Sequence, residues 1–187
     1  MGQMRADARA NRERILAAAE EVFGEQGVHA STEEVARRAD VGIATVFRHF
    51  PTKLELIEAT LVRHYEQLTE RADAMAAVPD AGAALADLVI VMVETGATKL
   101  TLANLLTESG SFPAAARAAS EAVYAAVGRV LRRAQDAGAV RVDVSVDELY
   151  FLVRGLSLAS ASRPEPAATA HRAVALVLAG LAAKPGG

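Results

Sequence analysis

Residues 31–53 read STEEVARRADVGIATVFRHFPTK, and this stretch predicts two short helices joined by a tight turn. Val35 and Ala36 stand where the helices would touch, and a small side chain at residue 36 lets their backbones approach closely. Val46 and Phe50 are one helical turn apart and are expected to face inward as well. This spacing is typical of a helix-turn-helix, a motif whose second helix lies in the DNA major groove.

The ends of these helices carry matching signals. Ser31 with Glu34, and Thr52 with Glu55, form capping boxes that start the first helix and the helix after the motif. Pro51 has no N–H to donate and restricts the residue before it, so the second helix should span about 43–49. The outward face of that helix then carries Ile43, Ala44, Phe47 and Arg48.

The same stretch resembles the TetR family of bacterial transcriptional regulators. The N-terminal domain of that family carries a signature similar to G-V-x-x-x-T-[LV]-[YF]-x-H-F, followed by a step such as Pro-x-Lys into the next helix. The residues that match in order and spacing are Val41, Thr45, Val46, Phe47, His49, Phe50 and Lys53. The resemblance covers roughly residues 10–65, whereas the remainder is similar only in length, helical content and loop placement.

Two residues depart from the family pattern. Asp40 stands where the family usually has glycine, at a turn position that prefers positive φ; we expect some strain there and no change of fold. Its negative charge near the phosphates should also weaken binding. Gly42 replaces a common serine cap, so one phosphate-facing hydroxyl is missing.

The composition indicates an all-α protein packed through small side chains, since 52% of the residues are hydrophobic and only 4% aromatic. The absence of cysteine excludes disulfides and thiolate metal sites, and we expect no cofactor. The N-terminus has no apolar signal segment, and the longest apolar run, 173–183, is too short to cross a bilayer. These features predict a cytoplasmic protein.

The charge of the chain gives no general argument for DNA binding. The net charge is −3, and residues 1–64 hold nine Lys and Arg against ten Asp and Glu. DNA binding therefore needs a local basic patch. The candidates around the motif are Arg37, Arg38, Arg48, His49 and Lys53.

The rest of the chain predicts further helices and two domains. Helices are expected at about 7–26, 52–77, 80–109 (as two helices broken near 98–101), 113–137, 145–160 and, after a 164–166 loop, 167–183; residues 140–144 should form an extended loop. The expected domains are a three-helix DNA-binding domain, 1–55, and a helical regulatory and dimerisation domain, 56–187. The helix from residue 52 joins them without a flexible linker.

The last two predicted helices are apolar on nearly all sides, and such helices must be buried. Pairing them with the same helices of a second copy gives a four-helix interface, as the family resemblance also implies; the alternative is that they form the core of the single chain. The residues assigned to the dimer interface are Leu149, Leu152, Val153, Leu156, Val174, Val177, Leu178 and Leu181.

The resemblance implies a homodimeric repressor that binds a roughly palindromic operator and is released by a small-molecule effector. We expect base contacts from Ile43, Ala44 and Arg48, where Arg48 could equally bind a phosphate. Phosphate contacts are assigned to Ser31, Thr32, Thr45, Phe47, His49 and Lys53. Candidate effector contacts are Tyr65, Met92, Thr95, Leu102, Asn104, Phe112 and Tyr124.

The sequence bears differently on two other classes of function. An enzyme is not expected, because the four histidines lack metal-ligand spacing and the chain has no Gly-rich phosphate loop, H-E-x-x-H or G-x-S-x-G motif. A helical interaction module that keeps the motif's shape without sequence-specific DNA binding stays open, because of Asp40 and the acidic charge balance.

Overall fold

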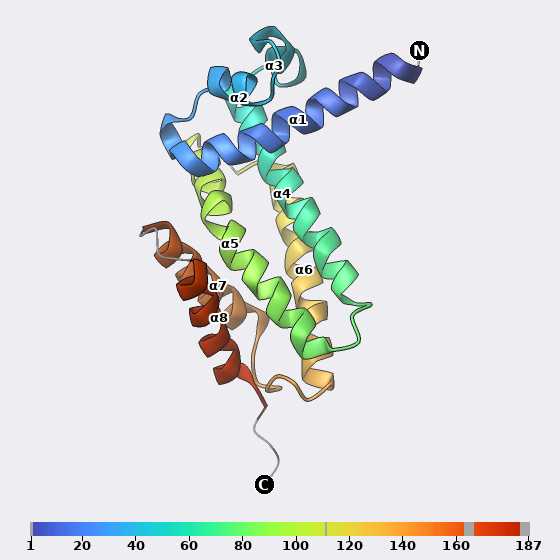
Figure 1. The fold of residues 1–187 in the computed structure, drawn as a ribbon, viewed down its shortest axis with the longest axis vertical. Helices are drawn as coiled ribbons and strands as arrows, with labels where there is room; N and C mark the ends of the chain where they lie inside the picture. Colours follow the sequence, from blue (N-terminus) through green and yellow to red (C-terminus); the bar gives the residue numbers. More distant parts are fainter. Residues whose placement is uncertain (1, 111, 163–166, 184–187) are drawn as a thin grey trace. The chain divides into compact units, whose positions relative to one another are not determined.

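The protein is described by a computed structural model that covers residues 2–110, 112–162 and 167–183. Over this part of the chain it is built from α-helices, one short 3₁₀ helix and a single isolated β-bridge, which confirms the all-α class (Figure 1). The helices are α1 (Gly2–Gln26), α2 (Thr32–Arg38), α3 (Ile43–His49), α4 (Lys53–Met75), α5 (Ala81–Glu108), α6 (Ala114–Asp136), α7 (Val146–Ser162) and α8 (Ala167–Leu181), with the 3₁₀ helix η1 at Gly27–His29.

The chain forms two compact units. Unit 1 consists of Met1–His64 and Thr98–Ala118, and unit 2 consists of Tyr65–Ala97 and Ala119–Gly187. Helices α4, α5 and α6 therefore each contribute residues to both units. The expected boundary between residues 55 and 56 is a functional one and stays a prediction.

Unit 1 is held together by the apolar stripe of α1. Ile15, Ala19, Val22 and Phe23 recur on one face of this helix and are all fully buried. The helix ends at Gln26, and the next residue, Gly27, has a φ of 55°, a left-handed conformation that favours glycine. The other buried side chains of this unit include Leu16, Val35, Ala36, Val46, Phe50, Leu56, Ile57 and Leu61.

The predicted break in residues 80–109 is wrong, because α5 is one continuous helix of 28 residues. The threonines of this segment each cost a helix only about 0.7 kcal/mol or less, and no proline interrupts residues 81–108. Two hydroxyls also bond back to a carbonyl one turn earlier: Thr95 to Val91 and Thr107 to Ala103, both at 2.9 Å. The helix is long and apolar enough to cross a membrane. However, 44% of its most apolar 18-residue stretch is buried within the protein itself.

Unit 2 follows the predicted pattern more closely. The inner face of α6 is buried and carries Val123, Val127, Val130, Leu131 and Ala134. Arg133 of this helix donates to the carbonyl of Met75, the last residue of α4, at 3.1 Å. Residues 140–144 form the expected loop, with one antiparallel bridge between Val140 and Ala182. Ser145 and Glu148 make a complete capping box at the start of α7. The predicted 164–166 loop lies outside the described residues.

Candidate nucleic-acid interface

The segment from α2 to α3 has the local geometry that its sequence predicts. Ser31 Oγ accepts the Glu34 N–H at 3.1 Å, which caps α2. The turn after α2 is closed by the Val41 N–H, which donates to the Ala36 carbonyl at 3.0 Å. Asp40 lies in this turn with φ 53°, the only positive φ outside glycine among the described residues. The expected left-handed turn is thus confirmed.

Helix α3 is short, as its flanking residues require. Gly42 precedes it with φ −69° and ψ 145° and offers no side-chain cap. Phe50 follows it in an extended conformation, directly before Pro51. Val46 is fully buried, so the helix is fixed on unit 1 by its inner face.

The outer face of α3 carries the three residues predicted to reach base edges. Ile43, Ala44 and Arg48 are all exposed, and so is Phe47, with 42% of its surface accessible. Arg48 Nη2 makes a long hydrogen bond of 3.4 Å to Thr45 Oγ1. None of these side chains packs into the protein's own interior, which is the condition for α3 to enter a groove.

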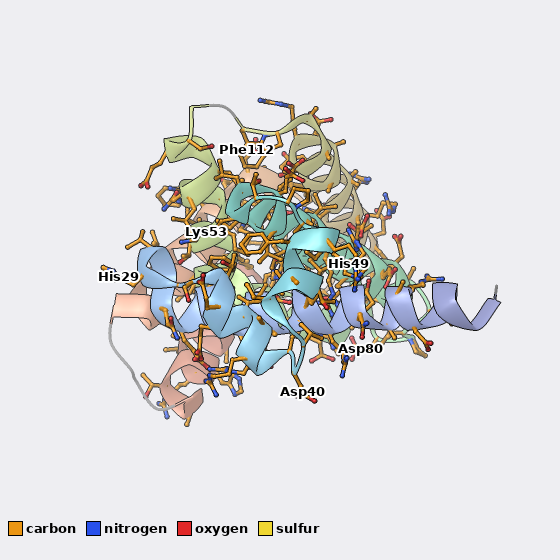
Figure 2. The ribbon with its side chains drawn as sticks, turned by 90° about the horizontal axis from the view of Figure 1, so that it is seen from above. His29, Asp40, His49, Lys53, Asp80 and Phe112 are labelled. Carbon is orange, nitrogen blue, oxygen red and sulfur yellow. The ribbon has the colours of Figure 1, made fainter. Side chains whose placement is uncertain are left out.

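The residues assigned to phosphate have more varied surroundings. Ser31, Thr45, His49 and Lys53 are half-buried at the surface of unit 1, and Phe47 is exposed. Lys53 Nζ lies 5.8 Å from the centroid of the Phe23 ring, a cation–π contact. Thr32 differs, because it is 8% exposed and its hydroxyl donates to Glu33 at 3.3 Å. Figure 2 labels Asp40, His49 and Lys53.

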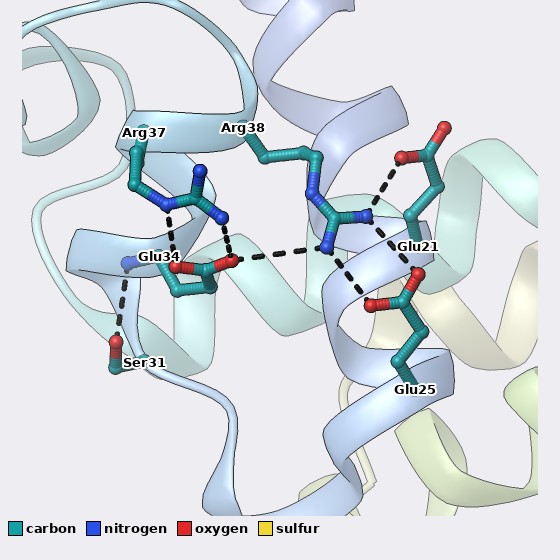
Figure 3. Close-up of polar contacts among 6 residues, drawn as sticks. All are labelled: Glu21, Glu25, Ser31, Glu34, Arg37 and Arg38. Atoms are coloured by element: carbon teal, nitrogen blue, oxygen red, sulfur yellow. Dashed lines mark hydrogen bonds and ion pairs between the residues drawn. The ribbon is translucent and has the colours of Figure 1, made fainter.

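Two of the five residues predicted to form a basic patch are paired with acidic side chains, so the patch is smaller than predicted (Figure 3). Arg37 forms a bidentate pair with Glu34, with Nε–Oε2 at 2.9 Å and Nη2–Oε1 at 2.5 Å. Arg38 reaches α1, where it binds Glu21 at 3.2 Å and Glu25 at 2.9 Å. The hydrogen bond from Arg37 lowers the pKa of Glu34, and the bond from Arg38 lowers the pKa of Glu25.

This pairing corrects the expectation of five cations around the motif: Arg48, His49 and Lys53 remain without a carboxylate partner in the described ion pairs. The sequence analysis assigned no role to Glu21 and Glu25, the two partners of Arg38 on α1. The periodicity held a signal, because both lie one helical turn apart on α1.

The seven candidate effector contacts do not fall in one unit. Tyr65, Met92, Thr95 and Tyr124 belong to unit 2, whereas Leu102, Asn104 and Phe112 belong to unit 1. Tyr65, Met92 and Leu102 are buried, Thr95 and Phe112 are half-buried, and Asn104 and Tyr124 are exposed. The seven residues are therefore not shown to line one cavity.

In unit 2 the structure adds a tyrosine that the sequence analysis did not single out. The rings of Tyr124 and Tyr150 stack with their centroids 5.4 Å apart. The Tyr124 hydroxyl donates to Asp147 at 2.8 Å, and burial raises the pKa of both Tyr65 and Tyr150. A tyrosine on an otherwise apolar helix, at residue 150, was the available sign.

Helices α7 and α8 are only partly covered within the chain. Leu149, Val153 and Val174 are buried, so these three contribute to the interior of unit 2 and not to its surface. Leu152, Leu156, Val177, Leu178 and Leu181 are half-buried. Phe151 and Leu176 are strongly exposed, at 79% and 66%. An open groove of about 540 Å³ beside Phe151 is lined by Leu152, Leu181, Val144, Arg141, Asp143, Asp147 and Glu148.

Helix α3 is short, buries its inner face and exposes its outer face, and the described residues form no β-strand. These features define a helix-turn-helix DNA-binding protein. Comparison with protein families agrees: residues 15–60 match the bacterial regulatory proteins of the tetR family, and residues 80–183 match the C-terminal domain of SbtR-like transcriptional regulators. The chain belongs to the TetR family of transcriptional regulators.

Solved structures show the same fold along nearly the whole chain. A TetR transcription regulatory protein from Mycobacterium vanbaalenii is 33% identical with a TM-score of 0.77, covering 96% of this chain and 99% of that one. A TetR regulator from Streptomyces coelicolor is 29% identical with a TM-score of 0.79, covering 93% and 99%. The transcriptional activator FasR of Mycolicibacterium smegmatis is 45% identical over 58 residues, which are 30% of this chain and 26% of FasR. The chain thus spans about a quarter of that curated relative.

Proposed function

We propose that this regulator binds a roughly palindromic DNA operator as a homodimer in the cytoplasm and is released by a small-molecule effector. The observation that carries the proposal is the exposed outer face of α3, with Ile43, Ala44 and Arg48 directed away from the core. Ile43 and Ala44 offer apolar contacts that suit thymine methyl groups. Arg48 offers a guanidinium fork that suits either a guanine edge or a phosphate.

Backbone contacts would place this helix on the duplex. Lys53, His49, Thr45, Phe47 and Ser31 surround the motif at the surface of unit 1 and supply these contacts. They carry no sequence information, so they hold the register while α3 reads the bases. The buried position of Thr32 supports a structural role for that residue more than a phosphate contact.

Dimerisation is supported by the uncovered apolar side chains of α7 and α8. Phe151 and Leu176 expose most of their surface, and the half-buried Leu152 and Leu181 line the groove beside Phe151. Large exposed apolar side chains that gather on two neighbouring helices mark an interaction surface. A second copy related by a two-fold axis would cover the same helices on both chains.

Release by an effector is supported by the continuity of α4. This helix begins at Lys53, four residues after α3, and runs without interruption to Met75 in unit 2. An effector bound among the unit 2 candidates Tyr65, Met92, Thr95 and Tyr124 would act on residues of the helix that also carries Lys53. A coupling of about 1–3 kcal/mol between the two sites suffices for regulation.

Fluorescence anisotropy with labelled duplex DNA tests the proposal. The affinity for mixed-sequence DNA should fall steeply on a log–log plot against salt. Lys53→Ala should weaken all sequences alike and lower that slope by about one, whereas Arg48→Ala should change the base preference if Arg48 contacts a guanine. Uniform weakening by Arg48→Ala assigns this residue to phosphate. Absence of binding at low salt would favour the second candidate, a helical interaction module. The slight excess of acidic residues in residues 1–64 is the observation that supports this alternative.

A further inference from the structure

The two consecutive arginines at the end of α2 have opposite surroundings. The Arg38 side chain is 29% exposed and turns toward α1, where it binds two carboxylates; its Nη2 also lies 3.7 Å from Glu34 Oε1. The Arg37 side chain is 70% exposed, and its carboxylate partner among the described residues is Glu34 of its own helix. Figure 3 shows the two guanidinium groups on either side of the Glu34 carboxylate.

The ion pairs of Arg38 with α1 stabilise the packing of two helices, whereas the pair of Arg37 with Glu34 lies within one helix. Arg38 joins segments 13 and 17 residues apart in the sequence, so it fastens α2 to α1. Arg37 and Glu34 lie three residues apart on α2, and such a pair adds only about 0.2–0.5 kcal/mol to helix stability. The fold does not depend on it, because Ser31 Oγ caps the backbone N–H of residue 34 whatever its side chain carries.

The pair has a larger effect on the electrostatic field at the motif. Arg37 lies directly before the turn into α3, and its carbonyl accepts the Asp40 N–H at 3.2 Å. It would be a cation beside the recognition helix in a segment where acidic residues outnumber basic ones. Both guanidinium contacts to the Glu34 carboxylate are 2.9 Å or less, so the two opposite charges largely cancel in the field that a nearby phosphate meets.

We propose that Glu34 is a specificity-determining residue that withholds Arg37 from the DNA phosphates. Contacts between cations and phosphates supply most of the binding to DNA of any sequence. An extra phosphate contact from Arg37 would raise the affinity for all DNA sequences. The base contacts of α3 would then supply a smaller share of the total binding free energy. Glu34 therefore keeps the non-specific affinity low, and the ratio of operator to non-operator binding high. The inference rests on the proposed DNA-binding function.

The test compares Glu34→Gln with Glu33→Gln as a matched control. Both substitutions remove one negative charge from the first turn of α2, but Glu33 makes no ion pair among those described. Anisotropy titrations would use mixed-sequence duplex DNA between about 50 and 200 mM salt. Circular dichroism and thermal melting would verify that every variant is folded.

Freeing Arg37 adds one phosphate contact, so Glu34→Gln should steepen the log–log salt dependence by about 0.9 relative to Glu33→Gln. Its affinity advantage over that control should then shrink by about 3.5-fold across this fourfold range of salt. Arg37→Ala alone should leave the wild-type slope unchanged, and Arg37→Ala combined with Glu34→Gln should abolish the gain.

Equal slopes for the two glutamine variants would overturn the proposal, since the charge alone would then explain any gain. A wild-type slope lowered by Arg37→Ala would also overturn it, because Arg37 would already contact a phosphate. If no variant binds DNA even at low salt, the proposed DNA-binding function itself fails. These outcomes therefore distinguish a failure of the Glu34 inference from a failure of the function it rests on.

Discussion

Replacing Gly96 by alanine should destabilise the protein, although alanine is the better helix former. Gly96 lies on α5, and an added Cβ would stand 2.7 Å from the Cβ of Ser157 on α7 and closer still to its hydroxyl. Ser157 is 1% exposed, and its hydroxyl donates to the Val153 carbonyl at 2.9 Å. Its Cβ is placed by the backbone, so no change of rotamer relieves the contact.

The magnitude follows from this distance. Carbon atoms in contact prefer about 3.5–4.0 Å, so the two helices would have to separate by about 1 Å. Overpacking of this kind costs about 1–3 kcal/mol, against which alanine recovers about 1 kcal/mol of helix propensity. Because the clash involves a backbone-placed atom, we expect the upper part of the range. The net loss is then about 1–2 kcal/mol, which lowers Tm by about 2–8 °C in a chain of this length.

Thermal melting followed by circular dichroism measures the change, and Ser157→Gly supplies the control. In the double variant the two small residues exchange sides, so the added Cβ finds space. The stability of the double variant should exceed the sum of the single effects by about 1–2 kcal/mol, a coupling typical of residues in contact. An increase of Tm in Gly96→Ala, or strict additivity of the two substitutions, would refute the close approach of α5 and α7.

Three further substitutions test other parts of the structure. Asp40→Gly should stabilise the fold by up to about 1 kcal/mol in thermal melts, because the residue has φ 53°, and loss of its charge should strengthen DNA binding; a lower Tm would contradict the strain. A hydrogen bond from His64, helped by nearby positive charge, lowers the pKa of Glu20 below its ordinary 4.5, so its stabilising effect is complete above that pH and is lost as pH falls through the lowered pKa. Glu20→Gln should therefore cost stability at neutral pH and progressively less as the pH falls below 4.5, whereas a constant difference would exclude this linkage. Phe151→Asp should shift the protein toward monomer in sedimentation experiments, and an unchanged mass would remove α7 from the proposed interface.

Much of the motif was predictable because its signals are local. The cap at Ser31, the left-handed turn at Asp40 and the end of α3 before Pro51 each depend on residues within one helical turn. Backbone sterics and short-range hydrogen bonds govern such features, so the residue types alone specify them. The exposure of Ile43, Ala44 and Arg48 follows in turn from the helical period set by Val46 and Phe50.

Other features depend on which side chains meet across long sequence separations. The pairing of Arg38 with Glu21 and Glu25 requires α1 and α2 to pack with one particular orientation, which composition does not reveal. The close approach of Gly96 on α5 to Ser157 on α7 is likewise visible only in the fold. Reading the local pattern alone therefore overestimated both the basic patch and the break in α5.

The order of amino acids was sufficient to specify most of the helices, the caps at Ser31 and Ser145 and the face of α3 that turns outward, because these arise from interactions between near neighbours along the chain. Which charges remain available to DNA, and which apolar side chains of α7 and α8 stay uncovered, emerged only after the helices had packed. Neutralisation and burial are properties of pairs in space, and residues such as Arg38 and Glu21 become partners only through the fold.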